Sequence, residues 1–327
     1  MKTHILVTGG AGYIGSHTCL ALHDAGFIPV AYDNLSRGHS SSCQWGPLVK
    51  ADLRETSRLI RTIKEYNIKS VIHFAAFAYV GESVTDPSLY YDNNVMGTLS
   101  LLQACEQTGV AHLIFSSSCA TYGIPEKNPI DETTKQNPVN PYGHSKKICE
   151  QIISDYQKIS NLKGVCLRYF NAAGNDPENR IGENHDPETH LIPNVIKAAL
   201  GYQQGLQIFG NDYPTPDGTC IRDYLHVMDL AQAHLQTLRL LIEKKPLPFA
   251  LNLGTGHGQS VKEIVQTVTE VTGRPIPIQN EDRRPGDPPM LVASAALAAK
   301  EINFKSKYDI KDCVKHATAW MNKLNSH

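Results

Sequence analysis

The sequence lacks the features of several classes of protein. Its 31 Lys and Arg residues nearly balance its 32 Asp and Glu residues, and the net charge of -1 offers no general attraction for nucleic acid or anionic lipid. No segment approaches the run of about 18 apolar residues that spans a bilayer, and Met1 to Thr8 is too short and too polar for a signal peptide. We therefore expect a cytoplasmic protein that binds neither nucleic acid nor membrane.

The cysteines also lack a pattern. All eight are dispersed along the chain, with no Cys-x-x-Cys pair and none of the spacings expected of a zinc site. This distribution indicates reduced thiols and predicts no metal site. The remaining composition is that of an ordinary folded protein, with 41% hydrophobic and 19% charged residues, and a length of 327 residues favours about two domains.

Apolar strand patterns alternate with helical patterns over the first half of the chain. Strands are expected at residues 4–8, 27–32, 71–74, 112–116 and 165–170. Helices are expected between them, at 13–25, 55–66, 87–107 and 141–159. Near-continuous apolar strands separated by helices indicate a parallel sheet covered on both faces. We therefore predict the α/β class, with a doubly wound parallel sheet of the Rossmann fold.

The pattern changes after the last of these strands. Residues 171–190 are polar and resemble a loop, and the short apolar segments that follow are interrupted by Gly and Pro. A helix near 229–243 and a strand near 249–253 again resemble those of the first half. We predict a first domain over 1–172, to which 225–253 return, and a smaller mixed α/β domain over 173–224 and 254–327.

Glycines mark the turn between the first expected strand and the first expected helix. Gly9, Gly12 and Gly15 lie where a sharp turn, close approach of a pyrophosphate and helix–strand packing need glycine. The amino end of the helix offers free N–H groups and a positive dipole to the anion. Asp33 ends the second strand, where a carboxylate accepts hydrogen bonds from both ribose hydroxyls and repels a 2′-phosphate, which favours NAD over NADP. The alternatives are a turn-forming Asp33 and, because Arg37 is close in sequence, NADP.

A tyrosine and a lysine lie one turn apart at the start of a later helix. Asn140 suits the N-cap and Pro141 the first helical position, so Tyr142 and Lys146 share a face. The ammonium should lower the pKa of the phenol from about 10, which suits a general base that takes a proton from a sugar hydroxyl. Ser118, at the carboxyl edge of the sheet, is placed to share that proton. Alternatively, Tyr142 and Lys146 only form part of a solvated helix face, and Ser118 only satisfies backbone groups at the end of the strand.

Longer segments carry a family pattern. They are Thr8–Gly15, Tyr90–Val95, Tyr142-x-x-x-Lys146, Arg168–Asn171, Phe209–Tyr213, Arg222–Tyr224 and Arg284–Asp287. On these segments the chain resembles the extended short-chain dehydrogenases/reductases and, more narrowly, the UDP-glucose (UDP-galactose) 4-epimerases. The resemblance extends from about residue 3 to about residue 290.

The resemblance implies a role for each matched position. Tyr142 would be the catalytic base, Lys146 its electrostatic partner and Ser118 a second hydroxyl at the sugar 4′-oxygen. The cofactor site would comprise Gly9, Gly12, Tyr13, Ile14, Gly15, Asp33, Asn34, Asp52, Leu53, Phe74, Ala75, Asn94, Tyr142, Lys146 and Tyr169. The substrate site would comprise Ser118, Tyr142, Asn171, Leu191, Phe209, Arg222, Arg284 and Asp287.

The resemblance also implies an activity and an assembly. The protein would be an isomerase that converts UDP-galactose to UDP-glucose in galactose metabolism, through a 4-keto intermediate and with tightly bound NAD. The first domain would bind NAD and the second the UDP-sugar, and helices near 87–107 and 142–159 would form a homodimer. Three positions depart from the family: Ala78 replaces a lysine near the cofactor, His190 an asparagine beside the uracil, and Leu291 a residue that gates N-acetyl sugars.

Other activities remain open on the sequence. Segments Tyr79–Ser83 and Cys119–Gly123 also resemble UDP-pentose 4-epimerases, and UDP-N-acetylglucosamine is a further candidate substrate. A nucleotide-sugar 4,6-dehydratase typically has Asp-Glu after the strand-end hydroxyl, where this chain has Cys119-Ala120. A non-catalytic NAD-sensing protein would have no need for Ser118, Tyr142 and Lys146 together.

Overall fold

The computed structural model describes residues 3–284 and 286–326. Pro285 of the Arg284–Asp287 segment and the ends of the two predicted domains, at residues 1–2 and 327, lie outside the described residues. In the described part of the chain, no helix is both long enough and apolar enough to cross a membrane.

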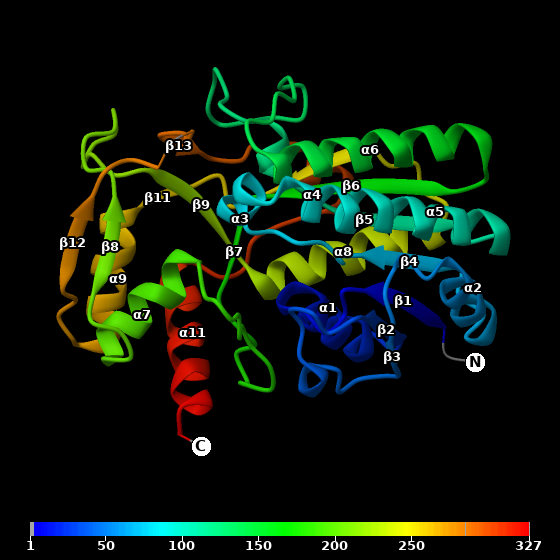
Figure 1. Ribbon diagram of the computed structural model, residues 1–327, viewed down its shortest axis with the longest axis horizontal. Helices are drawn as coiled ribbons and strands as arrows, with labels where there is room; N and C mark the ends of the chain where they lie inside the picture. The colour runs from blue at the N-terminus through cyan, green and yellow to red at the C-terminus, as the bar shows by residue number, and fades with distance from the viewer. Residues whose placement is uncertain (1–2, 285, 327) are drawn as a thin grey trace.

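A seven-stranded parallel sheet organises the larger part of the molecule (Figure 1). Its strands are β1 (His4–Thr8), β2 (Ile28–Asp33), β3 (Leu48–Lys50), β4 (Ser70–His73), β5 (His112–Ser118), β6 (Lys163–Tyr169) and β10 (Ala250–Leu253). They follow the order β10-β6-β5-β4-β1-β2-β3, and all neighbouring strands are parallel. The prediction of an α/β protein with a doubly wound sheet is confirmed.

The strand order reverses between β1 and β4. The chain runs outward from β1 to β2 and β3, and then continues on the other side of β1 with β4. Backbone hydrogen bonds fix the loop after β4 to the end of β1, because Phe74 N and Ala75 N donate to Thr8 O at 2.9 and 3.1 Å. Doubly wound sheets bind ligands in the crevice at such a reversal.

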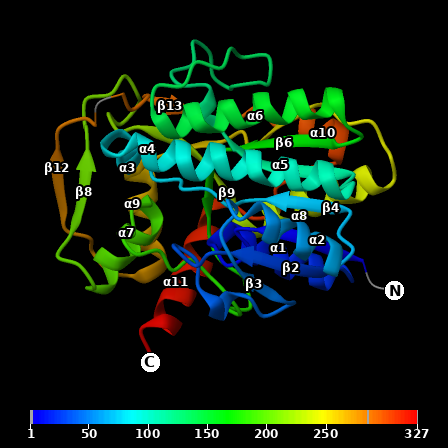
Figure 2. The ribbon, with the colours of Figure 1, turned by 45° about the vertical axis from the view of Figure 1, so that its right-hand side comes forward.

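Helices cover both faces of the large sheet. One face carries α2 (Thr56–Glu65), α5 (Gly97–Thr108) and α6 (Pro141–Ile159), and Figure 2 shows α5 and α6 side by side. The other face carries α1 (Tyr13–Asp24), α8 (Val227–Ile242) and α10 (Ala296–Ile302). Successive strand residues point to opposite faces, so in β1 Leu6 joins the first core and Ile5 and Val7 join the second.

The smaller part of the molecule is a mixed α/β assembly around β9 (Ile221–His226). This strand is antiparallel to β11 (Gly258–Ser260) and parallel to β7 (Asn171–Ala173) and β13 (Met290–Leu291). A separate two-stranded sheet pairs β8 (Leu206–Phe209) with β12 (Ile278–Glu281). The core of the smaller part is shared by α7 (Leu191–Leu200), α9 (Val261–Thr272) and α11 (Ile310–Leu324). Figure 1 shows α7 beside β8, and α11 packs against α7 and α9.

The helix predicted over 87–107 is interrupted. It consists of α4 (Pro87–Tyr90), a π-helical segment over Tyr91–Met96, and α5. A π-helical turn admits an extra residue and is common at functional sites. Several short elements with too few residues for a periodic signal were also not predicted, among them the edge strand β3, α3 (Val80–Thr85), η1 (Ser40–Ser42) and η3 (Cys119–Thr121).

The division into two domains stays a prediction. Helix α8 and strand β10 come from the range 225–253 and are part of the large-sheet layers. Helix α10 comes from the range assigned to the second domain, and it packs against α8 and β10. The peptide unit of Ile130 also forms an isolated bridge with Ala293, which ties the last part of the chain to the loop before α6.

Candidate active site

A cavity of about 1400 Å³ extends from the loops at the carboxyl ends of β1 and β4 to the smaller part of the molecule. Nearly all the residues predicted for the site line it. They are Gly9, Gly12, Tyr13, Ile14, Gly15, Asp33, Asn34, Asp52, Leu53, Phe74, Ala75, Ser118, Tyr142, Lys146, Tyr169, Asn171, Leu191, Phe209, Arg222, Arg284 and Asp287. The structure therefore brings together residues that lie up to 278 positions apart in the sequence (287 − 9).

The turn between β1 and α1 has no room for a side chain at Gly9 or Gly15. Gly9 has a φ of +70°, and a Cβ there would lie 2.6 Å from Ala75 N. A Cβ on Gly15 would lie 2.1 Å from Gly9 O. Among the described residues no side chain caps the amino end of α1. Its first N–H groups therefore remain available to bind an anion in the cavity, which Gly12 and Tyr13 line.

Two carboxylates lie beside the cavity at the ends of β2 and β3. Asp33 is buried and accepts hydrogen bonds from Ala11 N (3.0 Å) and Leu35 N (2.8 Å). Burial raises the pKa of Asp33, and these two hydrogen bonds oppose the rise. Asp52 accepts from Arg54 Nε at 2.8 Å and from Asn34 Nδ2 at 2.9 Å. The Arg54 hydrogen bonds hold the pKa of Asp52 well below its usual range.

Arg37 is the residue for which the sequence left NADP as an alternative cofactor. In the structure its guanidinium contacts neighbouring side chains. Its guanidinium pairs with Glu82. Its Cζ also lies 5.4 Å from the centre of the Phe77 ring and 5.1 Å from that of Tyr79. A guanidinium held by a carboxylate and two aromatic rings is less available to a 2′-phosphate.

The start of α6 has the predicted local structure. Asn140 is the N-cap and accepts from Gly143 N at 2.8 Å, with Pro141 in the first turn. Tyr142 and Lys146 are both buried and both line the cavity. Lys146 Nζ donates to Ser116 O at 2.7 Å and lies 6.0 Å from the centre of the Tyr142 ring. The lysine thus joins α6 to the end of β5.

Burial opposes the predicted lowering of the Tyr142 pKa. Burial raises the pKa of Tyr142 to about 12, and the adjacent Ser118 hydroxyl opposes this rise by favouring the phenolate. Burial also lowers the pKa of Lys146 to about 8. Sequence spacing placed the two groups on one face, but it could not show that both charged forms lose their hydration there.

Asn94 is the exception among the predicted cofactor residues, since it does not line the cavity. It is buried in the π-helical segment, and its side chain binds both backbone groups of Phe77, with Phe77 N donating at 2.8 Å and Asn94 Nδ2 donating to Phe77 O at 3.0 Å. Asn94 Nδ2 also donates to Ser145 Oγ at 3.0 Å. Asn94 therefore fixes the loop that forms one cavity wall.

The smaller part of the molecule supplies charged and aromatic groups to the opposite wall. Arg222 pairs with Asp287, and its Nη1 donates to Ile221 O at 2.8 Å. The Cζ of Arg284 lies 4.0 Å from the centre of the Phe209 ring. These side chains offer two guanidinium groups and a carboxylate at one end of the cavity.

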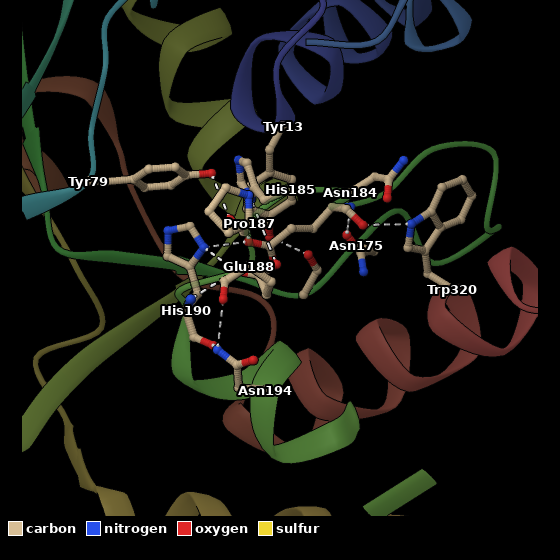
Figure 3. Close-up of polar contacts among 12 residues, drawn as sticks. Tyr13, Tyr79, Asn175, Asn184, His185, Pro187, Glu188, His190, Asn194 and Trp320 are labelled. Carbon is tan, nitrogen blue, oxygen red and sulfur yellow. Dashed lines mark hydrogen bonds and ion pairs between the residues drawn. The ribbon is translucent and has the colours of Figure 1, made fainter. Parts of the chain in front are cut away.

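Most of the loop that closes a third side of the cavity was not predicted from the sequence. Glu183, His185, Glu188 and His190 line the cavity and form an interacting cluster. Figure 3 shows His185, Glu188 and His190 together, with Tyr79 and Tyr13 nearby. Only His190 was noted, as a departure from the family. The available signal was the spacing of two glutamates and two histidines over eight residues (183–190).

Comparisons with known proteins agree with this geometry. Residues 5–254 match the family described as NAD dependent epimerase/dehydratase family. A UDP-glucose 4-epimerase from Rhizobium meliloti (strain 1021) is 50% identical over 324 residues, which are 99% of this chain and 98% of the relative.

Solved structures show the same similarity. UDP-glucose 4-epimerase from Brucella ovis in complex with NAD has a TM-score of 0.95 and 52% identity, covering 97% of this chain and 98% of that one. The Bifidobacterium longum UDP-glucose 4-epimerase in complex with NAD+ and UDP has a TM-score of 0.94 and 38% identity, covering 98% of each chain. The chain therefore belongs to the NAD dependent epimerase/dehydratase family.

Proposed function

We propose that this protein is an isomerase that interconverts UDP-galactose and UDP-glucose by NAD-dependent epimerisation at C4′, a step of galactose metabolism. The observation that carries the proposal is that Tyr142, Lys146 and Ser118 face one cavity together with the glycine turn after β1. The similarity to UDP-glucose 4-epimerases over nearly the whole chain supports it.

The residues around the reversal point fit NAD. The glycine turn leaves backbone N–H groups for a pyrophosphate, lined by Gly9, Gly12, Tyr13, Ile14 and Gly15. The adenosine end would be held by Asp33 and Asn34 at the ribose, with Asp52 and Leu53 at the base. The nicotinamide end would be held by Phe74, Ala75, Tyr142, Lys146 and Tyr169, while Asn94 would act through the Phe77 loop.

Tyr142 and Ser118 would handle the proton of the sugar 4′-hydroxyl. The phenolate of Tyr142 removes this proton, and the Ser118 hydroxyl donates to the developing charge. The Lys146 ammonium, held by Ser116 O, would stabilise the phenolate together with the positive charge of bound NAD, against the burial that raises the pKa of Tyr142 to about 12. Bound NAD supplies hydride acceptance and return, so the reaction proceeds through a 4-keto sugar and is redox-neutral.

The far wall of the cavity would hold the UDP half of the substrate. Arg222 and Arg284 supply positive charge to the diphosphate, and Asp287 accepts hydrogen bonds from a ribose diol. Asn171, Leu191 and Phe209 complete this part of the wall. If the nucleotide is fixed and the hexose is held loosely, the sugar can turn over and present its opposite face to the hydride donor.

The assembly and location are part of the same proposal. Residues 1–172 and 225–253 would bind NAD, and 173–224 and 254–327 the UDP-sugar. A second copy would pack on the helices near 87–107 and 142–159, which is supported by the exposed apolar side chains of Tyr91, Met96 and Ile148. A cytoplasmic location agrees with the dispersed, free cysteines.

One incubation tests the reaction and the sugar range. The purified protein is mixed with UDP-galactose, UDP-N-acetylgalactosamine or UDP-xylose without added NAD, and the products are resolved. UDP-glucose formed from UDP-galactose supports the proposal. The incubations with UDP-N-acetylgalactosamine and UDP-xylose show whether the cavity, with Leu291 in its lining, accepts an N-acetyl sugar or a pentose. A 4-keto-6-deoxy product would indicate the dehydratase, and no turnover of any sugar would indicate a sensor.

A further inference from the structure

We propose that Glu183, His185, Glu188 and His190 form a binding site for one divalent transition-metal ion such as Zn²⁺. The cluster lies in the loop before α7 and takes no part in the proton chemistry proposed above. The sequence prediction of no metal rested on cysteine spacing, whereas this cluster uses imidazole and carboxylate ligands, which suit such ions.

The four donor atoms converge. Glu183 Oε1 lies 3.0 Å from His185 Nδ1 and 2.9 Å from His190 Nδ1. Glu188 Oε1 lies 2.8 Å from His190 Nδ1, and Glu188 Oε2 lies 3.9 Å from His185 Nδ1. Bonds of about 2.0–2.2 Å to a tetrahedral ion separate its ligands by about 3.3–3.6 Å. One donor atom from each of the four residues lies within 4.8 Å of all the others, a range that includes this separation, so side-chain rotations would admit the ion.

Two atoms of this cluster are each shared between two partners. A ring Nδ1 carries one in-plane proton or one lone pair. Yet His190 Nδ1 faces oxygens of both glutamates, and Glu183 Oε1 faces the Nδ1 atoms of both histidines. One divalent ion would meet all four atoms, and its charge of about +2 would neutralise the two carboxylates while both imidazoles stay neutral. The glutamate side chains are only 6% and 4% exposed, so this neutralisation matters.

The surrounding structure holds the ligands in place (Figure 3). At one end, Glu183 N donates to Asn175 Oδ1 at 2.7 Å, and Trp320 Nε1 donates to Glu183 O at 3.0 Å. At the other end, Asn194 Nδ2 donates to His190 O at 2.9 Å. Contacts from other parts of the chain therefore position both ends of the ligand segment without help from an ion, as a preorganised site requires.

The ion would sit at the junction of the two parts of the molecule. The Tyr13 ring, from α1, and the His185 ring lie edge to face, with their centres 6.0 Å apart. Trp320, from α11, holds the same loop from the other side. Binding would therefore stabilise the loop over residues 183–190, which contacts both α1 and α11. It would also raise the unfolding temperature of the protein, because an ion that binds only the folded state favours that state.

Metal titration of the holoenzyme tests the site. Chelator-treated protein, retaining its nucleotide, is titrated with Co²⁺ and followed by visible absorption, and then with Zn²⁺ in competition and by thermal unfolding. We expect one ion per chain, a tetrahedral Co²⁺ spectrum without sulfur charge-transfer bands, and displacement by Zn²⁺. Both His185→Asn and His190→Gln should weaken binding at least tenfold, whereas the exposed His257→Gln control should not.

Three results would contradict the proposed metal site. No uptake at one ion per chain, sulfur charge-transfer bands that reveal thiolate ligands, or unchanged binding in His185→Asn and His190→Gln would each overturn the site. Circular dichroism of the two variants shows that they are folded, and Glu188→Gln provides a third ligand change. None of these measurements needs the sugar substrate, so they are independent of the proposed epimerase activity.

Discussion

Glu150 and Arg168 form a bidentate ion pair directly behind the strand that ends at Ser118. Arg168 Nε donates to Glu150 Oε1 at 2.9 Å and Arg168 Nη2 to Glu150 Oε2 at 2.6 Å. Ser117 Oγ donates to the same carboxylate at 2.5 Å. Glu150 lies one turn after Lys146 on α6, so its carboxylate ties the helix that carries the base to β6 through Arg168 and to β5, the strand that carries Ser118, through Ser117.

Removing one partner of this pair should destabilise the fold. Arg168→Met leaves the buried Glu150 carboxylate without its counter-charge, and we expect a loss of about 3–5 kcal/mol in the free energy of unfolding. Urea unfolding of the nucleotide-bound protein measures it. The matched control is Asp155→Ala, which breaks an exposed pair with Lys158 and should cause no measurable change. Equal effects of the two substitutions would contradict the structural role of the buried pair.

The phenol of Tyr142 should be essential for turnover. Tyr142→Phe keeps the ring but removes the group that takes the 4′-hydroxyl proton, so the rate should fall about 10²–10⁴-fold or more. Conversion of UDP-galactose measures it, and Tyr202→Phe, at a half-exposed tyrosine, is the control. Near-normal turnover by the Tyr142→Phe variant with bound NAD would show that another group is the base.

Asp33 should decide how firmly NAD is retained. Asp33→Ala removes the carboxylate proposed to bind the ribose diol and also the partner of Ala11 N and Leu35 N. We expect the nucleotide content of the purified protein, measured in the supernatant after denaturation, to fall well below one per chain. Asp24→Asn, at an exposed carboxylate of α1, should keep its nucleotide. Full NAD content in the Asp33→Ala variant would refute the assignment.

His234 should make the protein less stable in acid. Its ring is buried beside Phe74, with the ring centres 4.6 Å apart, and Nδ1 contacts Leu230 O at 2.9 Å. Burial lowers the pKa of His234 from 6.5 to about 4. Between these pH values the unfolded chain binds a proton that the folded chain does not, so stability falls as pH decreases.

The substitution His234→Phe isolates this effect. The difference between the two pKa values corresponds to about 3 kcal/mol, so the parent should lose roughly that much relative to the variant between pH 6.5 and 4. The reference is the difference in unfolding free energy between the parent and the variant at a pH of about 7.5, where the His234 ring is neutral in both the folded and the unfolded chain. If the difference in unfolding free energy between parent and variant stays constant down to pH 4, His234 is not the titrating group.

The sequence predicted those features that depend on neighbours along the chain. The glycine turn, the cap at Asn140 and the i, i+4 pair of Tyr142 and Lys146 need only local spacing, and the apolar strands between helices indicate the sheet. The spread of the site over both parts of the molecule followed from longer family segments.

Other features depend on groups that are distant in sequence. The pKa of Tyr142 follows from burial, and the engagement of Lys146 with Ser116 O depends on how α6 packs on β5. The π-helical segment turns Asn94 toward the Phe77 loop, which its helical pattern does not reveal. The cluster at 183–190 is positioned by Trp320, which lies 137 residues after Glu183 in the chain.

Isotope retention at C4′ tests the central claim most directly. UDP-galactose carrying deuterium at C4′ is incubated with the purified protein in ordinary water without added NAD, and the product is examined by NMR and mass spectrometry. Because the hydrogen leaves C4′ as hydride and returns to the opposite face, we predict UDP-glucose that keeps its deuterium. UDP-glucose in which the C4′ deuterium has been replaced by solvent hydrogen, or recovery of UDP-galactose alone with no UDP-glucose formed, would contradict the account.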